Sequence, residues 1–145
     1  MKNVFNQEYS SRLEEVEEDR REIEQVVVEH KDVFIGNAHS VRPRNGEDWH
    51  EWRLFVRMRD EDNIEDYIDK VVVKLHPTFT PSTVVLSDPP FEMKRLGWGV
   101  FNIKVTLHFK QEYNKKNLHT SHYLCFDGDG DFATHSIEFV RKTFK

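Results

Sequence analysis

Strict alternation between apolar and polar residues from Phe101 to Phe109 constrains the fold of this chain more than any other feature of the sequence. The apolar members of the run are Phe101, Ile103, Val105, Leu107 and Phe109, and the polar members between them are Asn102, Lys104, Thr106 and His108. Successive side chains of an extended strand point to opposite faces, so this run predicts a strand with one buried face. A second such strand is predicted by the spacing of Trp52, Leu54, Val56 and Met58.

Further strands are predicted on both sides of these two runs. The segments Val33–Ile35, Val71–His76 and Ile137–Phe139 are rich in β-branched or aromatic residues. Gly36 and Asn37 directly follow the first segment and suggest a bend there. Short strands separated by Pro, Gly and Asp turns indicate an all-β fold, an antiparallel β-sandwich.

The N-terminal segment differs from the rest of the chain in charge and in periodicity. Residues 8–29 hold nine acidic and three basic side chains, whereas the whole chain has a net charge of −5. Ser11 and Glu14 form a capping box, and apolar residues follow at helical spacing: Tyr9, Leu13, Val16, Ile23 and Val27. We therefore expect residues 1–31 to be an acidic helical segment that packs on the body or meets a partner, and residues 32–145 to be the sandwich domain.

One short helix is expected between the strands. Asp62 and Glu65 form a second capping signal, and Ile64, Tyr67 and Ile68 would share one helical face. The predicted fold is thus an all-β sandwich with an N-terminal helix and one short helix between strands.

Composition narrows the class of protein. The aromatic content of 12% argues against a disordered chain. The single cysteine excludes an internal disulfide framework and a cysteine zinc site, and it favours a reducing, intracellular compartment. The sequence has no long apolar run and no secretory signal, so no membrane partner is expected. The pI near 5.9 argues against binding of duplex nucleic acid.

No catalytic set of residues assembles in the sequence. It has no serine elbow between glycines, no phosphate-binding glycine loop and no HExxH motif. His119 and His122 are three apart on a predicted strand, so they face opposite sides and cannot chelate a metal together. Cys125 lies between Leu124 and Phe126 and is predicted to be a buried structural thiol. We therefore expect no enzymatic activity, no metal and no cofactor.

One acidic segment partly matches a calcium-binding loop. Asp127, Asp129, Asp131 and Glu138 occupy the first, third, fifth and twelfth positions of such a loop. Phe132 stands at the sixth position, where the loop requires glycine, and a strand rather than a helix is predicted after it. The segment is therefore interpreted as a Gly/Asp turn.

The strongest functional signal lies in three segments. They read WHEWRLFVR at 49–57, VVVKLHPTF at 71–79, and DPPFE at 88–92 leading into GWGVF at 97–101. In this order and at this spacing the segments resemble the YEATS domain family, over about Phe34 to Lys110 and more weakly to Phe144. The VFIGN run at 33–37 resembles the branch of the family found in histone acetyltransferase and remodelling complexes.

The resemblance implies an immunoglobulin-like sandwich that binds acylated lysine of histone tails in a pocket formed by loops at one end. Phe79 and Trp98 would be the two aromatic walls of this pocket. The Thr78 hydroxyl would bind the acyl amide, and the backbone N–H of Trp98 would bind the acyl carbonyl. His76 would line or brace the pocket.

Further positions follow from the same resemblance. Gly97 and Gly99 would allow the loop to approach closely, and Trp49 is the nearest candidate for an additional aromatic residue. Tyr123 stands where some members have an acidic residue, so an arginine-binding role is not expected there. The implied protein is a nuclear subunit of a chromatin-modifying or remodelling complex. Its partners would be the acylated tail of histone H3 and the other subunits of that complex.

The chemistry of the ligand agrees with these residue types. An acylated lysine, whether acetylated or crotonylated, is neutral and flat at its amide, and aromatic faces bind such a plate by apolar burial. A hydroxyl and a backbone N–H would satisfy its two polar ends. A second function remains open, an immunoglobulin-like scaffold that docks a protein partner or a histone without reading acylation. An enzyme is the third alternative, but the sequence offers no nucleophile or activated water for it.

Overall fold

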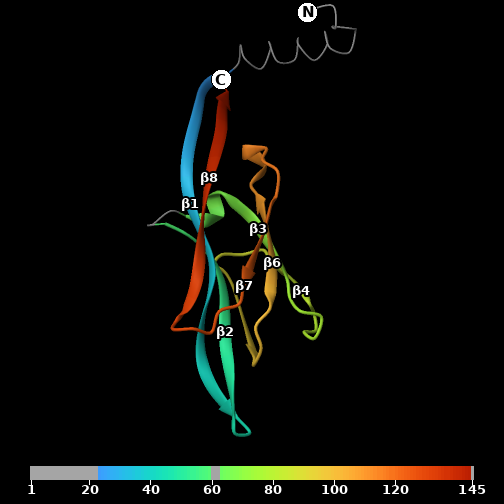
Figure 1. Ribbon diagram of the computed structural model, residues 1–145. Coiled ribbons are helices and arrows are strands. Elements are labelled where there is room, and N and C mark those ends of the chain that lie inside the picture. Colours follow the sequence, from blue (N-terminus) through green and yellow to red (C-terminus); the bar gives the residue numbers. More distant parts are fainter. Residues whose placement is uncertain (1–22, 60–62, 145) are drawn as a thin grey trace, which may run out of the picture. The chain divides into compact units, whose positions relative to one another are not determined.

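The computed structural model describes residues 23–59 and 63–144 of the chain (Figure 1). In this part of the chain, the regular elements are eight strands and two short 3-10 helices. The strands are β1 (Ile23–Arg44), β2 (Glu47–Met58), β3 (Ile68–Lys74), β4 (Thr83–Leu86), β5 (Phe91–Gly97), β6 (Asn102–Phe109), β7 (Leu118–Tyr123) and β8 (Gly130–Phe144). The helices are η2 (Ile64–Asp66) and η3 (Gln111–Tyr113).

The strands form two four-stranded sheets. One has the order β5-β2-β1-β8 and the other the order β4-β3-β6-β7. The pairs β1–β2, β2–β5, β3–β4, β3–β6 and β6–β7 are antiparallel. Since side chains from both sheets share one buried cluster, the fold is an antiparallel β-sandwich, which confirms the predicted all-β class.

The chain divides into two compact units. His30–Phe139 form the larger unit, which contains the buried core. The other unit is Met1–Glu29 with Val140–Lys145, and of it the structure describes residues 23–29 and 140–144. The division into domains at residues 31 and 32 stays a prediction.

The N-terminal helix falls mostly on residues 1–22, outside the described part of the chain. Ile23 and Val27, which were assigned to its apolar stripe, lie in strand β1 instead. The helical assignment was therefore wrong at this end. The physical reason is the run Val26–Val28, because β-branched side chains favour an extended backbone.

The predicted alternation in β2 and β6 is confirmed. In β6, Ile103, Val105 and Leu107 are 0% exposed, while Asn102 and Lys104 face solvent. In β2, Trp52 and Leu54 are fully buried. Burial of such side chains stabilises the fold by about 1.5–3 kcal/mol each. The sandwich therefore has one continuous apolar core between its sheets.

The strand does not end at Gly36 and Asn37, where a bend was expected, because β1 continues through both residues to Arg44 in unbroken register with β2. Gly36 has another role. A Cβ atom there would overlap the backbone oxygen of Asp131 and the side chain of Phe132. Glycine at this position lets the start of β8 approach β1 closely.

The predicted short helix is present as the 3-10 turn η2. Its capping residue Asp62 lies outside the described residues. Ile68, assigned to the face of this helix, opens β3 instead and is fully buried. The helix is shorter than expected, because the alternating run that forms β3 begins directly after Tyr67. In the described part of the chain, no helix is both long enough and apolar enough to cross a membrane.

Candidate functional site

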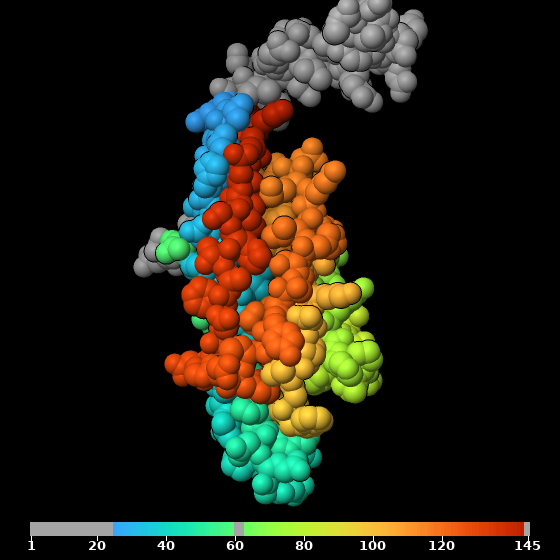
Figure 2. Space-filling view, in the orientation of Figure 1, coloured from blue at the N-terminus to red at the C-terminus, as the bar shows by residue number. Residues whose placement is uncertain are grey.

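A cavity of about 720 Å³ opens at one end of the sandwich. The loop between β3 and β4 and the connection between β5 and β6 come together at this end (lime and gold in Figure 2). Ten residues line the cavity: Trp49, His76, Thr78, Phe79, Leu96, Gly97, Trp98, Gly99, Val100 and Phe101. All seven residues selected from the sequence are among them, so three separate segments of the chain meet at one place. Their roles in binding stay predictions.

Three lining residues were not selected from the sequence: Leu96, Val100 and Phe101. Leu96 and Val100 flank the Gly-Trp-Gly turn and are 40% and 43% exposed. Apolar residues on both sides of a proposed binding turn were the signal that could have identified them. Phe101 was assigned only to the strand, although it also faces the cavity.

Phe79 is held in place by a cluster of aromatic side chains. Its ring centroid lies 5.6 Å from that of Phe101 and 6.1 Å from that of Trp52, and the contact with Trp52 is edge-to-face. Such aromatic pairs contribute about 0.5–1.5 kcal/mol each beyond area burial. Phe79 is thus a half-buried wall supported from behind by the core.

Trp98, unlike the half-buried Phe79, is mostly exposed to solvent, with 71% of its surface accessible. It lies between β5 and β6, and its backbone contributes to the turn that borders the cavity. An exposed tryptophan in a turn loses little packing when it is replaced. It gains apolar burial when a flat ligand covers it.

His76 controls the orientation of the Thr78 hydroxyl. The backbone N–H of Thr78 donates to Nδ1 of His76 at 3.2 Å, so this nitrogen is an acceptor and carries no proton. The hydroxyl of Thr78 lies 2.9 Å from the same nitrogen and must act as the donor in that contact. Its oxygen lone pairs are then available to accept a hydrogen bond from a ligand N–H.

Trp49 reaches the cavity from β2 and is half-buried. The guanidinium carbon of Arg44 lies 4.9 Å from the centre of its ring, in a cation–π contact. Arg44 therefore restricts the position of the ring from the side of the β1–β2 hairpin. The structure places Trp49 at the site, as the sequence suggested.

The resemblance implies that the two glycines of the turn allow a close approach of the loop. A Cβ atom on Gly99 would meet no atom within 4 Å, and one on Gly97 would make only ordinary contacts with Trp52 and Phe79. No close contact with another described part of the protein therefore requires glycine at either position, and a close approach to a ligand stays a prediction. Gly99 leaves open space beside Trp98.

A separate polar cluster joins β1 to the segment after β7. The side-chain oxygen of Asn37 accepts hydrogen bonds from Nε2 of His122 at 2.6 Å and from the backbone N–H of Cys125 at 2.9 Å. Desolvation by burial lowers the pKa of His122, and the charge of Asp131 opposes this in part. His119 lies on the same strand but is exposed, so the two histidines do not meet, as predicted.

Two other sequence interpretations concern the segment after β7. Cys125 lies in the loop beyond the end of β7 and is half-buried. The prediction of a fully buried thiol was therefore wrong.

The Asp127–Asp131 segment forms a turn, in which the backbone N–H of Gly130 donates to the backbone oxygen of Asp127 at 3.0 Å. Gly128 and Gly130 have positive φ angles of 55° and 120°, which favour glycine. Among the described residues, no group of three or more His, Cys, Asp or Glu side chains could hold a metal ion.

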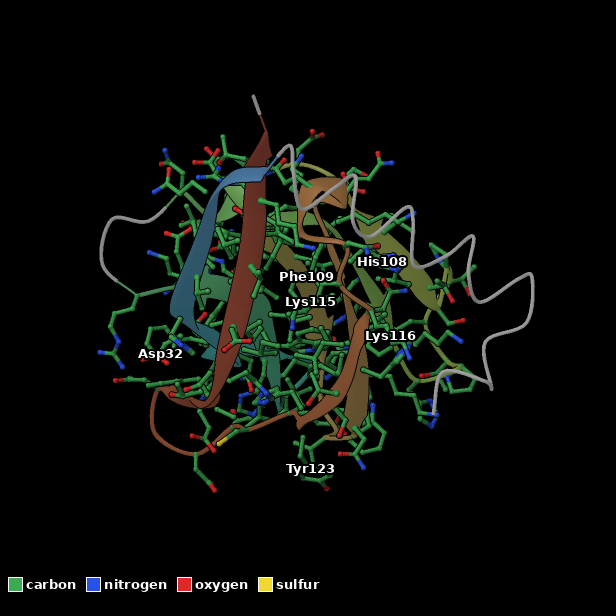
Figure 3. All side chains as sticks on the ribbon, turned by 90° about the horizontal axis from the view of Figure 1, so that it is seen from above. Asp32, His108, Phe109, Lys115, Lys116 and Tyr123 are labelled. Carbon is green, nitrogen blue, oxygen red and sulfur yellow. The ribbon has the colours of Figure 1, made fainter. Side chains whose placement is uncertain are left out.

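Tyr123 lies outside the cavity. It ends β7, is 59% exposed, and points away from the sandwich in Figure 3.

Among the residues that line the cavity none is acidic, so the site is apolar and bordered by a hydroxyl, an imidazole and backbone groups. A cavity of this composition suits a neutral, flat ligand with a few polar atoms.

Comparison with known proteins agrees with this description. The model of the YEATS family matches residues 47–128. A protein AF-9 homolog from Eremothecium gossypii is 44% identical over 75 residues, which cover 52% of this chain and 36% of that protein. The protein AF-9 homolog of Saccharomyces cerevisiae is 40% identical over 98 residues, which cover 63% of this chain and 43% of that protein. The match thus spans less than half the length of these curated relatives.

Solved structures show the same fold. The Yaf9 YEATS domain bound to H3K27ac has a TM-score of 0.70 and 28% identity, with 82% of this chain and 90% of that chain covered. The Yaf9 YEATS domain recognizing an H3K122suc peptide has a TM-score of 0.66, also at 28% identity, with 83% and 90% covered. Fold and site together define a β-sandwich domain with an aromatic-lined cavity at the loop end. This chain belongs to the YEATS family.

Proposed function

We propose that this chain is a reader domain that binds acylated lysine of a histone tail, with the acyl group between Phe79 and Trp98. The observation that carries the proposal is the convergence of Trp49, the 76–79 loop and the 97–99 turn on one cavity. Yaf9, whose YEATS domain shares this fold, has been solved with acetylated and succinylated H3 peptides.

The cavity offers a partner to each part of the ligand. The aliphatic stem and the acyl group bury apolar surface against Phe79 and Trp98. The oxygen of Thr78, whose own proton is directed to His76, accepts the amide N–H. The backbone N–H of Trp98 donates to the acyl carbonyl, so neither polar end of the amide is left unsatisfied.

Unmodified lysine is rejected by its charge. An ammonium that enters the cavity loses its hydration, and the described lining residues include no carboxylate to replace it. Acylation removes this charge. Selectivity therefore arises mainly from the exclusion of the wrong ligand.

Crotonyl-lysine is proposed to bind more tightly than acetyl-lysine. The longer, conjugated acyl chain buries more apolar area, at about 25 cal/mol per Å², and stacks flat on the aromatic rings. Its double bond is already rigid, so ordering it costs little. The gain should be about two- to tenfold in affinity. A butyryl peptide, with the same number of carbon atoms, separates the effect of conjugation from that of size.

The biological setting is proposed from the relatives. Similar proteins include AF-9 homologs and transcription initiation factor TFIID subunit 14b of Arabidopsis thaliana. We therefore place this chain in the nucleus, as a non-enzymatic subunit of a chromatin-modifying or remodelling complex. Other subunits and the H3 tail are its proposed partners.

Calorimetry with matched histone H3 peptides tests the function. The peptides carry an acetylated, crotonylated or unmodified lysine at one position. The acylated peptides should bind at least about tenfold more tightly, a difference of roughly 1.4 kcal/mol. Equal affinity for all three would contradict a reader and support the scaffold alternative, in which the domain docks a histone or another partner without sensing acylation.

A further inference from the structure

The outer face of the sheet β4-β3-β6-β7 carries positive charge on three of its strands. Alternate residues of β3 and β6 are buried in the core, so the residues between them point outward. From Lys70 onward in β3, and throughout β6 and β7, these outward positions hold basic or neutral residues and no acidic one. The basic residues are Lys70, Lys74, Lys104, His108 and His119. We call the surface that these five residues form the basic face.

Two lysines of the basic face lie directly opposite each other. Lys74 of β3 and Lys104 of β6 are register partners in an antiparallel pair, and both are exposed. Like charges in this arrangement repel each other and destabilise a sheet. Within residues 23–59 and 63–144, neither these two lysines nor Lys70 forms an ion pair. Positions that break a local rule of stability without compensation are often functional.

The positive charge of the face also acts on His108. Burial lowers the pKa of His108 from its ordinary value of 6.5, and the charges of Lys70 and His119 lower it further. Asp69, in the bulge beside Lys70, opposes this in part. Its carboxylate lies 3.7 Å from Nζ of Lys110 and is therefore already paired.

The outer face of the other sheet shows a different pattern. There Arg57 and Arg53 pair with Glu92 at 3.2 Å and 3.8 Å, and Arg42 pairs with Glu51 at 3.5 Å. The positive charges of these arginines are thus compensated within the domain. The lysines of the basic face have no such compensation among the described residues, so a partner molecule can supply it.

We propose that the basic face binds an acidic segment of a partner protein, whose glutamate or aspartate side chains pair with Lys70, Lys74 and Lys104. The size of the face fits such a segment. Lys70 and Lys74 are four residues apart on one strand, about 13 Å, which an extended peptide of about four to five residues spans. Because no residue of the face lines the cavity, this inference does not depend on the proposed acyl-lysine function.

A short acidic peptide fits this surface better than a nucleic acid does. The whole chain has a net charge of −5, so the chain outside the basic face is acidic on balance. A duplex would extend past the face and be repelled there. A short segment stays near the lysines, and repulsion from exposed charges more than about 10 Å away is largely screened.

Calorimetry of the full chain with an oligoglutamate peptide at low salt tests the proposal. The peptide should bind, and its affinity should fall as the salt concentration rises, because the attraction is between exposed charges. Lys104→Glu should weaken binding about five- to tenfold. The variant should keep or raise the Tm, since it replaces repulsion of Lys74 by attraction. NMR gives a local readout, because a bound anion should raise the pKa of His108 above its value in the free protein.

Lys94→Glu is the matched control. Lys94 is also an exposed lysine on a strand, but it lies in β5 of the other sheet. This variant has the same net charge as Lys104→Glu and should bind the peptide within about twofold of the wild type.

Four results would overturn the proposal. The first is no binding of the peptide at low salt, and the second is an equal loss of affinity in both variants, which would indicate a response to net charge alone. The third is tighter binding of a short DNA duplex of equal charge, which would assign the face to nucleic acid. The last is self-association that Lys104→Glu removes, which would assign the face to a second copy of this chain.

Discussion

Nε2 of His122 lies 2.6 Å from the side-chain oxygen of Asn37, although 85 positions separate the two residues in the sequence. Asn37 belongs to β1 and His122 to β7, which are strands of different sheets. The amide nitrogen of Asn37 also donates to the backbone oxygen of Cys125 at 2.8 Å. A nearly buried asparagine thus joins the two sheets by polar contacts within an otherwise apolar interior.

Replacement of Asn37 should destabilise the fold. Asn37→Ala leaves the N–H groups of His122 and Cys125 without their acceptor, at a cost of at least about 2 kcal/mol in the free energy of unfolding. Urea unfolding measures this. Asn117→Ala is the control, because Asn117 is exposed and its loss should change stability by less than about 0.5 kcal/mol. Equal stability of the two variants would contradict a structural role for Asn37.

The pH dependence of stability should depend in part on His122. Burial lowers the pKa of His122 from its ordinary value of 6.5, so the unfolded chain takes up a proton at a higher pH than the folded chain. The contribution of His122 to stability is therefore fully present above pH 6.5 and decreases as the pH falls from there towards the folded-state pKa.

Urea unfolding at about pH 7.5 and about pH 5.5 checks this contribution. The wild-type protein should lose more stability on acidification than His122→Gln, whose neutral amide can still donate to Asn37. The same loss in both proteins would show that His122 is not responsible.

Trp98→Ala should remove acyl-peptide binding and leave the domain folded. Trp98 is 71% exposed, so the core does not depend on it, but one wall of the cavity is lost. The affinity for a crotonylated peptide should fall more than about tenfold, which calorimetry can measure. Phe132→Ala removes another exposed aromatic residue, outside the cavity lining, and should bind as the wild type does. Unchanged affinity of Trp98→Ala would mean that Trp98 is only a turn residue.

The hydroxyl of Thr78 should contribute one hydrogen bond to the ligand. Thr78→Val keeps the shape of the side chain and removes the acceptor, so the affinity for an acetylated peptide should drop about three- to tenfold. Thr78→Ser restores the hydroxyl and should recover most of the binding. If the valine variant binds as tightly as the wild type, the amide N–H of the ligand has another acceptor.

The Asp127–Asp131 turn is expected not to bind calcium. Phe132 stands where a calcium loop requires glycine, and β8 rather than a helix follows the turn. Thermal unfolding should give the same Tm with about millimolar calcium and with a chelator. A rise of several degrees with calcium, reversed by the chelator, would contradict this.

Much of the fold could be predicted because the relevant patterns are local. The alternation in β6 assigns each side chain to a face without reference to any other strand, and the buried Val105 and Leu107 confirm it. Helical spacing over Ile23 and Val27 was misleading. A few apolar positions at three- or four-residue intervals are also compatible with a strand, and the valine run between them decided in favour of β1.

The candidate site could be predicted only in part. Its residues came from sequence segments that resemble a family, and the cavity contains all of them. The contacts that support these residues could not be found in this way. The edge-to-face contact between Phe79 and Trp52, for example, is invisible in the sequence, because it depends on how the loop after β3 packs against β2.

The sequence by itself determined the strands β2, β3 and β6, the faces that β2 and β6 bury and the residue types available for binding, because each of these depends on neighbouring residues along the chain. Only the tertiary structure decided that β1 continues through Gly36 and Asn37, since β8 must approach there. It also decided that Trp49, Phe79 and Trp98 share one cavity. Such proximities depend on strand register and on packing between sheets, and these arise from contacts between residues far apart in the chain.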